Sequence, residues 1–206
     1  MKSILLVIIG LCCSLLSAQK RVDKSIDAQD ITTLQINGKN CFKIHVISTH
    51  TNQIVIQTRI DGEHSEEMIV ITRKSNDSLY VSTQFQPLFE ADNDKLSAHK
   101  LMSIELEIQI PKHFNLNIKS DISSVVTQGV FNTAFIELNQ GNCRLESFVG
   151  SATINTIQGS IYVETNFANV KASSRHGVVT IQRLISGENQ LDLKSIHGDI
   201  SVFKIE

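Results

Sequence analysis

The chain has no tryptophan, only two prolines and no excess of one charge. Its 206 residues include 19 Lys and Arg against 21 Asp and Glu, which gives a net charge of -2. Without surplus basic residues the chain is poorly suited to bind nucleic acid or an anionic bilayer. The low glycine and proline content excludes a collagen-like chain, and a hydrophobic fraction of 41% is too high for a disordered one. Length and composition therefore predict one globular domain with a buried core.

Long apolar runs are also absent, apart from one at the N-terminus. Lys2 precedes a largely apolar stretch at residues 4–16, and the small residues Ser17 and Ala18 suit a cleavage site. This order is typical of a secretory signal peptide. The stretch is too short for a helix that spans a hydrocarbon core of roughly 30 Å. We therefore predict a signal peptide at residues 1–18 and a single exported domain at residues 19–206, located in the periplasm, on the outer surface or in the medium, with no transmembrane span after cleavage.

Cysteine becomes scarce once the signal peptide is removed. Cys12 and Cys13 lie inside it, so Cys41 and Cys143 are the two that remain. An exported chain can join them, yet each lies among apolar neighbours. A disulfide and two buried free thiols therefore both remain open.

The C-terminal half repeats itself. Five windows of ten residues share an apolar start, a sixth position that is usually glycine, and mostly apolar eighth and tenth positions; they are residues 118–127, 136–145, 154–163, 172–181 and 193–202. Their starts are separated by 18, 18, 18 and 21 residues. The sixth position is Ser123 in the first window, and in the others it is occupied by what we interpret as structural turn glycines, namely Gly141, Gly159, Gly177 and Gly198.

Apolar residues two apart between glycine turns form a strand pattern. One repeat is too short to bury its own apolar face, whereas stacked repeats place equivalent residues in interior columns. Stacking in sequence order puts Ile161 between Cys143 and Val179. The pattern predicts an all-β fold, a single-stranded β-solenoid with coils of about 18 residues and regular repeats over about 116–206. A β-sandwich is the alternative, and the less regular strands before Pro111 predict degenerate coils or a cap.

Two sequence features carry a family resemblance. They are the strand run Ile104–Pro111 and the repeated Ile-Xaa-Gly-Xaa-Ile-Xaa-Val of residues 157–163 and 196–202. Together with the signal peptide, they make the chain similar to the bacterial putative-adhesin family, which is related to auto-transporter adhesin head domains. The resemblance extends from about Asp30 to the end. It implies an exported, right-handed β-solenoid of mostly unknown function, and it supplies no binding residue.

No pattern predicts a catalytic, cofactor-binding or metal site. A glycan-cleaving enzyme needs two carboxylates that flank one bond, and the outward repeat positions bring no two together on neighbouring coils. Carboxylates at residues 61–67 are the remaining candidates for such a site. His176 and His197 each precede a repeat glycine and are expected to stack, but the column offers no further ligand to complete a metal site. We therefore expect no enzyme activity, no cofactor and no metal.

One long irregular connection contains three apolar residues around Pro87. These residues, Phe85, Leu88 and Phe89, either cover the edge of the sheet or form a contact surface for a partner. We expect a non-catalytic, adhesin-like interaction module of the cell envelope, with an unknown envelope protein or a surface glycan as partner. The alternatives are a glycan-acting enzyme on a β-solenoid scaffold and a periplasmic accessory subunit of an envelope complex.

The predicted signal peptide gives a direct test. The exported protein should begin near Gln19, because the apolar stretch ends in small residues there. Intact-mass measurement on protein recovered from outside the cytoplasm checks this. A mass that still includes residues 1–18 would show that the segment is not a cleaved signal.

Overall fold

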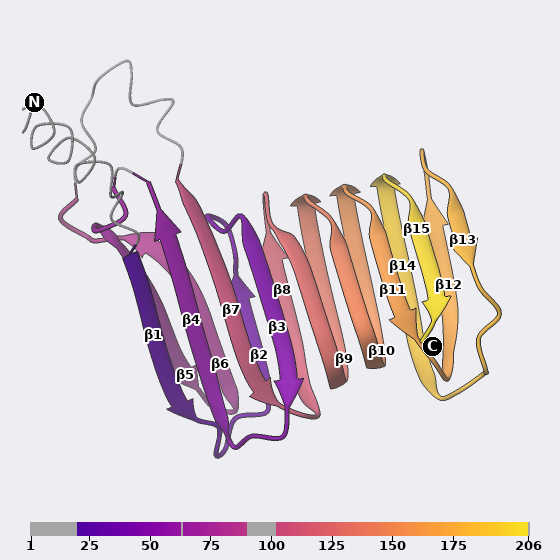
Figure 1. Cartoon of the computed structure of the whole chain (residues 1–206), viewed down its shortest axis with the longest axis horizontal. Helices are drawn as coiled ribbons and strands as arrows, with labels where there is room; N and C mark the ends of the chain where they lie inside the picture. The colour runs from indigo at the N-terminus through magenta and orange to yellow at the C-terminus, as the bar shows by residue number, and fades with distance from the viewer. Residues whose placement is uncertain (1–19, 63, 90–101, 206) are drawn as a thin grey trace, which may run out of the picture.

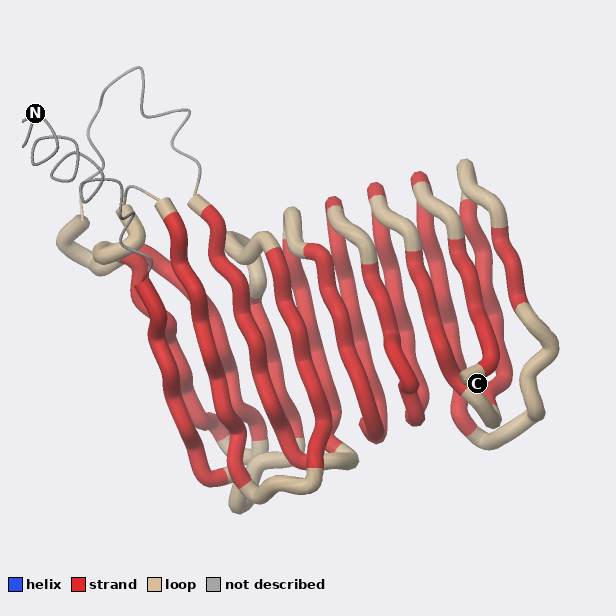
Figure 2. The backbone as a smooth tube through the Cα atoms, viewed as in Figure 1, coloured by secondary structure: helices blue, strands red, loops and turns tan. Residues whose placement is uncertain are grey.

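The strands form two layers with the apolar core between them (Figures 1 and 2). The computed structural model describes residues 20–62, 64–89 and 102–205, and these contain strands and no helix. The all-β prediction is confirmed. The predicted signal peptide at residues 1–18 lies outside the described residues, as does most of the irregular connection. Within the described part, no helix has the length and hydropathy needed to span a bilayer.

Two strands contribute to both layers, β9 (Ser124–Gln140) and β10 (Cys143–Gln158). On one side of them the front layer, so called from its place in Figure 1, contains in order β1 (Lys20–Asp27), β4 (Gln53–Asp61), β7 (Ser103–Pro111) and β3 (Lys43–Thr49). On their other side it continues with β11 (Ile161–Thr165), β15 (Ile200–Lys204) and β13 (Val179–Ile181).

The back layer has a matching order. Before β9 and β10 it contains β5 (Met68–Ser75), β6 (Ser78–Phe85), β2 (Thr33–Asn37) and β8 (Phe114–Ser120). After them come β14 (Asn189–His197) and β12 (Ala168–Ser174).

Alternation along each strand builds the core. In β7 the inward residues are no more than 1% exposed, and they are Ile104, Leu106, Ile108 and Ile110. The residues between them are polar and turn outward, because successive side chains of a strand point to opposite faces. One face of each layer is therefore apolar and buried against the other layer, and the opposite face is free to carry polar groups.

The C-terminal half pairs in the register that the sequence period predicts. Cys143 pairs in parallel with Val125 on one side and with Ile161 on the other, and both lie 18 positions away. In the back layer Ala152 pairs with Ala134, again 18 positions before it. Equivalent residues of successive repeats therefore share an interior column.

The last two strands do not take the place that sequence order predicts. β14 lies between β10 and β12, and β15 lies between β11 and β13. The expectation that Val179 is the next neighbour of Ile161 is wrong, because Ile200 pairs with both of them.

Burial gives the physical reason for this exchange. The window 193–202 supplies Leu193, Ile200 and Val202, all 0% exposed. The window 172–181 begins with the small residue Ala172, where the other repeats have Ile or Leu. It forms the end of the stack, where each strand has one neighbour and Val179 is 37% exposed. The more apolar window thus takes the position that is covered on both sides.

The N-terminal part is a mixed sheet and not a uniform series of coils. β1 and β7 both pair antiparallel with β4, and β5 pairs antiparallel with β6, whereas β2 and β3 have parallel neighbours. The turn between β5 and β6 explains one antiparallel pair. Only antiparallel strands can be joined by a two-residue turn, and Asn76 there adopts a φ of 53°, which asparagine tolerates better than most residues.

The turn glycines stack where the chain passes from one layer to the other. The Gly141 N–H donates to the Gln158 carbonyl at 3.0 Å, and the Gly159 N–H donates to the His197 carbonyl at 2.9 Å. A Cβ at Gly159 would collide with the Gly141 carbonyl, and one at Gly198 would collide with the Gly159 carbonyl. The same obstruction holds for Gly141 against Ser123 and for Gly177 against Gly198. Any larger residue would force neighbouring coils apart.

Cys41 and Cys143 are free thiols, and both are fully buried. Burial raises the pKa of Cys41 from 9.0 to about 11 and that of Cys143 from 9.0 to about 12, because the thiolate loses its hydration in the core. Neither thiol is placed to act as a nucleophile at neutral pH.

The order of the last strands can be tested with a matched pair of valines. Val202→Ala should lower the free energy of unfolding by about 2 kcal/mol, since Val202 is fully buried. Val179→Ala should cost less than about 1 kcal/mol, because that side chain is at the open end of the stack. Urea unfolding of both variants measures the difference. If the repeats stacked in sequence order, Val179→Ala would lower the free energy of unfolding more than Val202→Ala.

The buried thiols predict a loss of stability at high pH. Their pKa values are higher in the folded protein than in the unfolded chain, so their contribution is complete below pH 9 and declines as the pH rises toward 12. Between pH 8 and pH 10.5 the urea midpoint of the wild type should fall further than that of Cys143→Ala. At pH 8 a thiol reagent should modify the protein only after unfolding; rapid modification of the native protein would contradict the burial.

Candidate functional site

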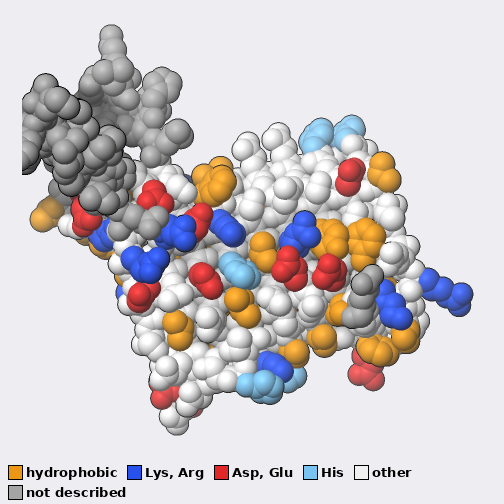
Figure 3. Space-filling view, viewed as in Figure 1, with side chains coloured by type: hydrophobic (Ala, Val, Ile, Leu, Met, Phe, Trp, Pro, Cys, Tyr) orange, Lys and Arg blue, Asp and Glu red, His pale blue; other side chains and the backbone are white. Residues whose placement is uncertain are grey.

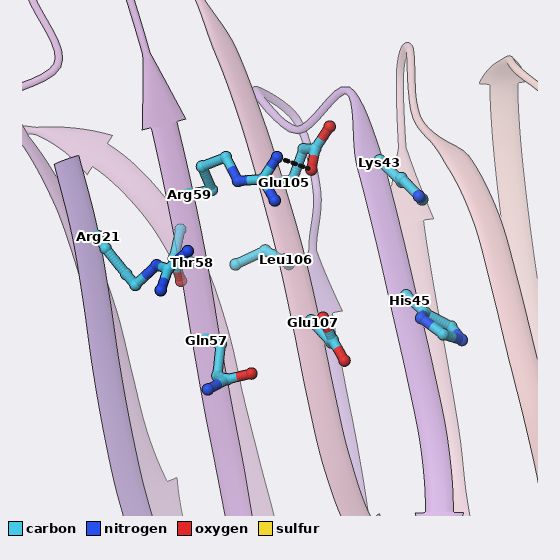
Figure 4. Close-up of a pocket in the computed structure, with 9 residues that line it drawn as sticks. All are labelled: Arg21, Lys43, His45, Gln57, Thr58, Arg59, Glu105, Leu106 and Glu107. Carbon is cyan, nitrogen blue, oxygen red and sulfur yellow. Dashed lines mark ion pairs between the residues drawn. The ribbon is translucent and has the colours of Figure 1, made fainter. Parts of the chain in front are cut away.

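The front layer carries a charged pocket on its outward face (Figure 4). It encloses about 160 Å³, and its lining comes from β1, β3, β4 and β7. The residues that line it are Arg21, Lys43, His45, Gln57, Thr58, Arg59, Glu105, Leu106 and Glu107. Strands that are distant in the sequence therefore supply one site.

Cross-strand pairing explains why these residues meet. Arg59 pairs with Arg21 on one side and Glu105 on the other, and Lys43 follows Glu105 in the same row. A second row, parallel to the first, runs through Asp23, Gln57, Glu107 and His45. Directly opposed residues on paired strands share a face and lie close enough to interact. The inward-pointing Thr58 and Leu106 lie beneath these rows, and each is 1% exposed.

The charges in the pocket are only partly compensated. Arg59 Nη1 lies 3.5 Å from Glu105 Oε2, and both side chains are partly exposed, so this pair adds little stability. Arg21 faces Arg59 across the strand pair, and opposed like charges are unfavourable. Among the described residues, the side chains of Arg21, Lys43 and Glu107 make no ion pair or hydrogen bond. These three groups are free to contact a ligand.

Figure 4 shows how these side chains lie. Arg21 extends from β1 over β4, and Arg59 extends from β4 over β7 toward Glu105. Gln57 and Glu107 lie side by side below them in this view. His45 Nε2 is buried and has no hydrogen-bond partner within the described part of the chain. The arrangement is rich in hydrogen-bonding groups and contains both signs of charge.

Sequence reasoning missed Glu105 and Glu107 as site residues. They lie on the strand run that carried the family resemblance, and its strict alternation could have placed both carboxylates on one outward face. Their Cα atoms are about 7 Å apart, as for any residues two apart on a strand. Glu105 is engaged with Arg59, whereas Glu107 makes no ion pair among the described residues.

The second row continues past the pocket through Val126 to Arg144 and Tyr162. We call these two residues and Phe203, which lies on β15 two positions beyond the Tyr162 partner Ser201, the aromatic row. The Arg144 guanidinium lies over the Tyr162 ring at 4.3 Å from its centroid, and the Tyr162 and Phe203 centroids are 5.2 Å apart. The Tyr162 hydroxyl donates to Glu164 Oε1 at 2.7 Å, and this bond is the main cause of a raised pKa for Tyr162. Arginine and tyrosine are enriched among the residues that dominate protein interfaces.

The whole front face shows both signs of charge. In Figure 3 basic and acidic side chains are interspersed over the front layer, with apolar side chains between them. Such a surface has no field of a single sign over its whole extent. It instead suits a partner with several kinds of polar group.

The apolar residues singled out in the irregular connection lie at and after the end of β6. The rings of Phe85 and Phe89 stack at 4.8 Å, and Phe89 also contacts His64 at 4.9 Å. Leu88 is 95% exposed. Two of the three side chains therefore pack against each other, and the third is almost fully exposed. Their role as a partner contact stays a prediction.

The two repeat histidines stack as expected. The rings of His176 and His197 lie 4.7 Å apart at an interplanar angle of 10°. In the part of the chain that the structure describes, no group of three or more His, Cys, Asp or Glu is placed to hold a metal ion.

Comparison with known proteins finds a likeness in structure and none in sequence. No protein-family model matches the chain, and no curated protein matches it. A putative cell adhesion protein from Clostridium sporogenes superposes with a TM-score of 0.64 at 12% identity, over 91% of this chain and 100% of that one. This likeness shows a shared fold.

Two further solved structures match more weakly. A putative adhesin from Bacteroides fragilis has a TM-score of 0.43 at 9% identity, over 92% of this chain and 99% of that one. A putative lipid binding protein from Parabacteroides distasonis has a TM-score of 0.33 at 10% identity, over 93% of this chain and 98% of that one.

Proposed function

We propose that the protein is an exported, non-catalytic β-solenoid of the cell envelope that presents its front face as an adhesin-like contact surface. The observation that carries this proposal is the pocket on the front layer, where Arg21, Lys43 and Glu107 lack partners among the described residues. Charged groups held on a sheet without internal partners are available to an external one. The fold that the chain shares with a putative cell adhesion protein supports the same class of function.

The scaffold suits a binding role. Contact residues here project from paired strands and not from loops, so their backbone positions are fixed before a partner arrives. Preorganisation lowers the entropy lost on association. The 18-residue register and the glycine contacts support a single-stranded solenoid for the C-terminal half, a stiff support for this face. Its right hand is what the family resemblance implies.

The partner is an envelope protein or a surface glycan. A module of this kind can act alone or as a periplasmic accessory subunit of an envelope complex, and both uses need the same exposed face. The aromatic row extends the contact area beyond the pocket, because Arg144 and Tyr162 are on the same row of outward residues as Glu107 and His45.

One observation favours a second candidate, a glycan-acting enzyme. Glu105 and Glu107 lie in one pocket, and a glycosidase needs two carboxyl groups within reach of one bond. Against this, both project from one strand to the same side, whereas the catalytic pair must flank a bond. Arg59 also interacts with one of them as a carboxylate.

Binding of the mature protein to envelope fragments tests the proposal. Fluorescently labelled protein should bind fragments from the producing bacterium, and the double variant Arg21→Ala with Tyr162→Ala should bind at least about tenfold less, a loss of roughly 1.4 kcal/mol. The control is Lys194→Ala, a partly exposed lysine of the back layer. Equal binding by all three proteins, with unchanged thermal midpoints, would exclude the front face as the contact surface.

A turnover assay on the same proteins separates the two candidates. Incubation with a panel of acidic and neutral polysaccharides should release no products. Product release that disappears in Glu105→Gln with Glu107→Gln would establish the enzyme and overturn the non-catalytic proposal.

A further inference from the structure

We propose that the front-face pocket binds an acidic saccharide, whose anionic group lies between Arg21 and Arg59 while its hydroxyls bind Gln57 and Glu107. This inference rests on the proposed contact function and names the ligand class. Carboxylate and sulfate are two anionic groups that such sugars carry, and both present oxygen acceptors to a guanidinium.

The anion half of the site consists of two arginines on neighbouring strands. Arg21 and Arg59 are directly opposed in the register of β1 and β4, where their mutual repulsion is unfavourable. Glu105 pairs with Arg59 only, at 3.5 Å between Glu105 Oε2 and Arg59 Nη1. Arg21 has no ion partner within the described residues. Guanidinium groups bind planar oxyanions through two parallel hydrogen bonds. An anion between the two arginines would relieve the repulsion.

The hydroxyl half lies in the next row. Gln57 pairs directly with Glu107, and neither side chain has a hydrogen-bond partner in the described part of the chain. A carboxylate only accepts hydrogen bonds, whereas a glutamine amide both donates and accepts. Sugar hydroxyls supply both kinds of group. The side-by-side position of these two residues therefore matches adjacent hydroxyls of one ring.

The mixed charge of the pocket argues against a simple anion as its ligand. Glu105 and Glu107 would repel inorganic phosphate or a nucleic-acid backbone, even though Arg21, Arg59 and Lys43 would attract it. A molecule that combines one anionic group with several neutral hydroxyls satisfies both sets of side chains. Acidic saccharides have this combination.

The size of the pocket fits one sugar unit of a longer chain. Its volume of about 160 Å³ is well below the roughly 300–1,000 Å³ of pockets that enclose drug-sized molecules. The pocket is on an exposed sheet face, so neighbouring sugar units can continue over the surface. Binding to one site should be weak, and several copies of the protein on one polymer would gain by avidity.

Titration calorimetry on the mature protein at low salt tests the inference with four ligands. They are trigalacturonate, its methyl ester, a sulfated trisaccharide and inorganic phosphate. Trigalacturonate or the sulfated trisaccharide should bind, which also identifies the anionic group. The methyl ester keeps the hydroxyls and loses the charge. If the anionic group is a carboxylate, the ester should bind at least tenfold more weakly than trigalacturonate. Inorganic phosphate should bind at least tenfold more weakly than whichever acidic saccharide binds.

Two variants assign the halves of the site. Arg21→Gln should weaken binding of the acidic saccharide at least tenfold, while the back-layer control Lys194→Gln leaves it unchanged. Glu107→Gln is the decisive variant. It should weaken binding of the acidic saccharide, because a charge-assisted hydrogen bond from a sugar hydroxyl to the carboxylate is lost. A simple anion site would instead bind more tightly after that change, since a repelling charge is removed.

The outcomes separate this inference from the proposed function. Phosphate binding as tight as the saccharide, tighter binding by Glu107→Gln, or no binding of either acidic saccharide would overturn the inference. If envelope fragments still bind through the front face in that case, the contact function stands and its ligand is of another class. If the protein binds neither the acidic saccharides nor the envelope fragments, the inference and the proposed function are both wrong.

Discussion

Parallel pairing in register is the interaction on which the rest of the structure depends. A strand of this chain has one apolar side, and it is stable only when neighbours satisfy its backbone groups and the opposite layer covers that side. Pairing at an offset of 18 residues does both, because it aligns equivalent apolar residues, such as Val125, Cys143 and Ile161, in one interior column. The glycine contacts set how closely successive coils approach. The outward rows of the repeats are a consequence of the same register, whereas the pocket depends on the antiparallel pairing of β4 with β1 and β7.

Much of this could be predicted from the sequence, because alternation and period are local properties. They predicted the all-β fold and the residues that share columns. They could not predict the order of the last strands, because windows 172–181 and 193–202 carry the same glycine and the same spacing, and a period does not state which repeat lies beside which. Tertiary burial decides that: the window that begins with the small Ala172 takes the end, and the window that begins with Leu193 is covered on both sides. The antiparallel pairs likewise depend on short turns, such as the one at Asn76.

The candidate site was beyond sequence analysis for a related reason. Its residues come from β1, β3, β4 and β7, and each is an ordinary polar residue at an outward position of its strand. Only the pairing of β4 with both β1 and β7 brings Arg21, Arg59 and Glu105 into one row. The carboxylates of β7 show the limit most clearly, since this strand lies before the repeats and shares no period with them. A pocket that depends on both parallel and antiparallel strand pairs cannot be recognised from the 18-residue sequence repeat.

The central claim is that a stack of in-register strands, with its last two strands inserted before its end, supports the outward rows. Amide hydrogen exchange measured along the native chain tests it most directly. We expect slow exchange in β14 and β15, which have neighbours on both sides, and fast exchange in β12 and β13, which come earlier in the chain and form the open edge. Slow exchange in β12 and β13 with fast exchange in β14 and β15 would contradict the account.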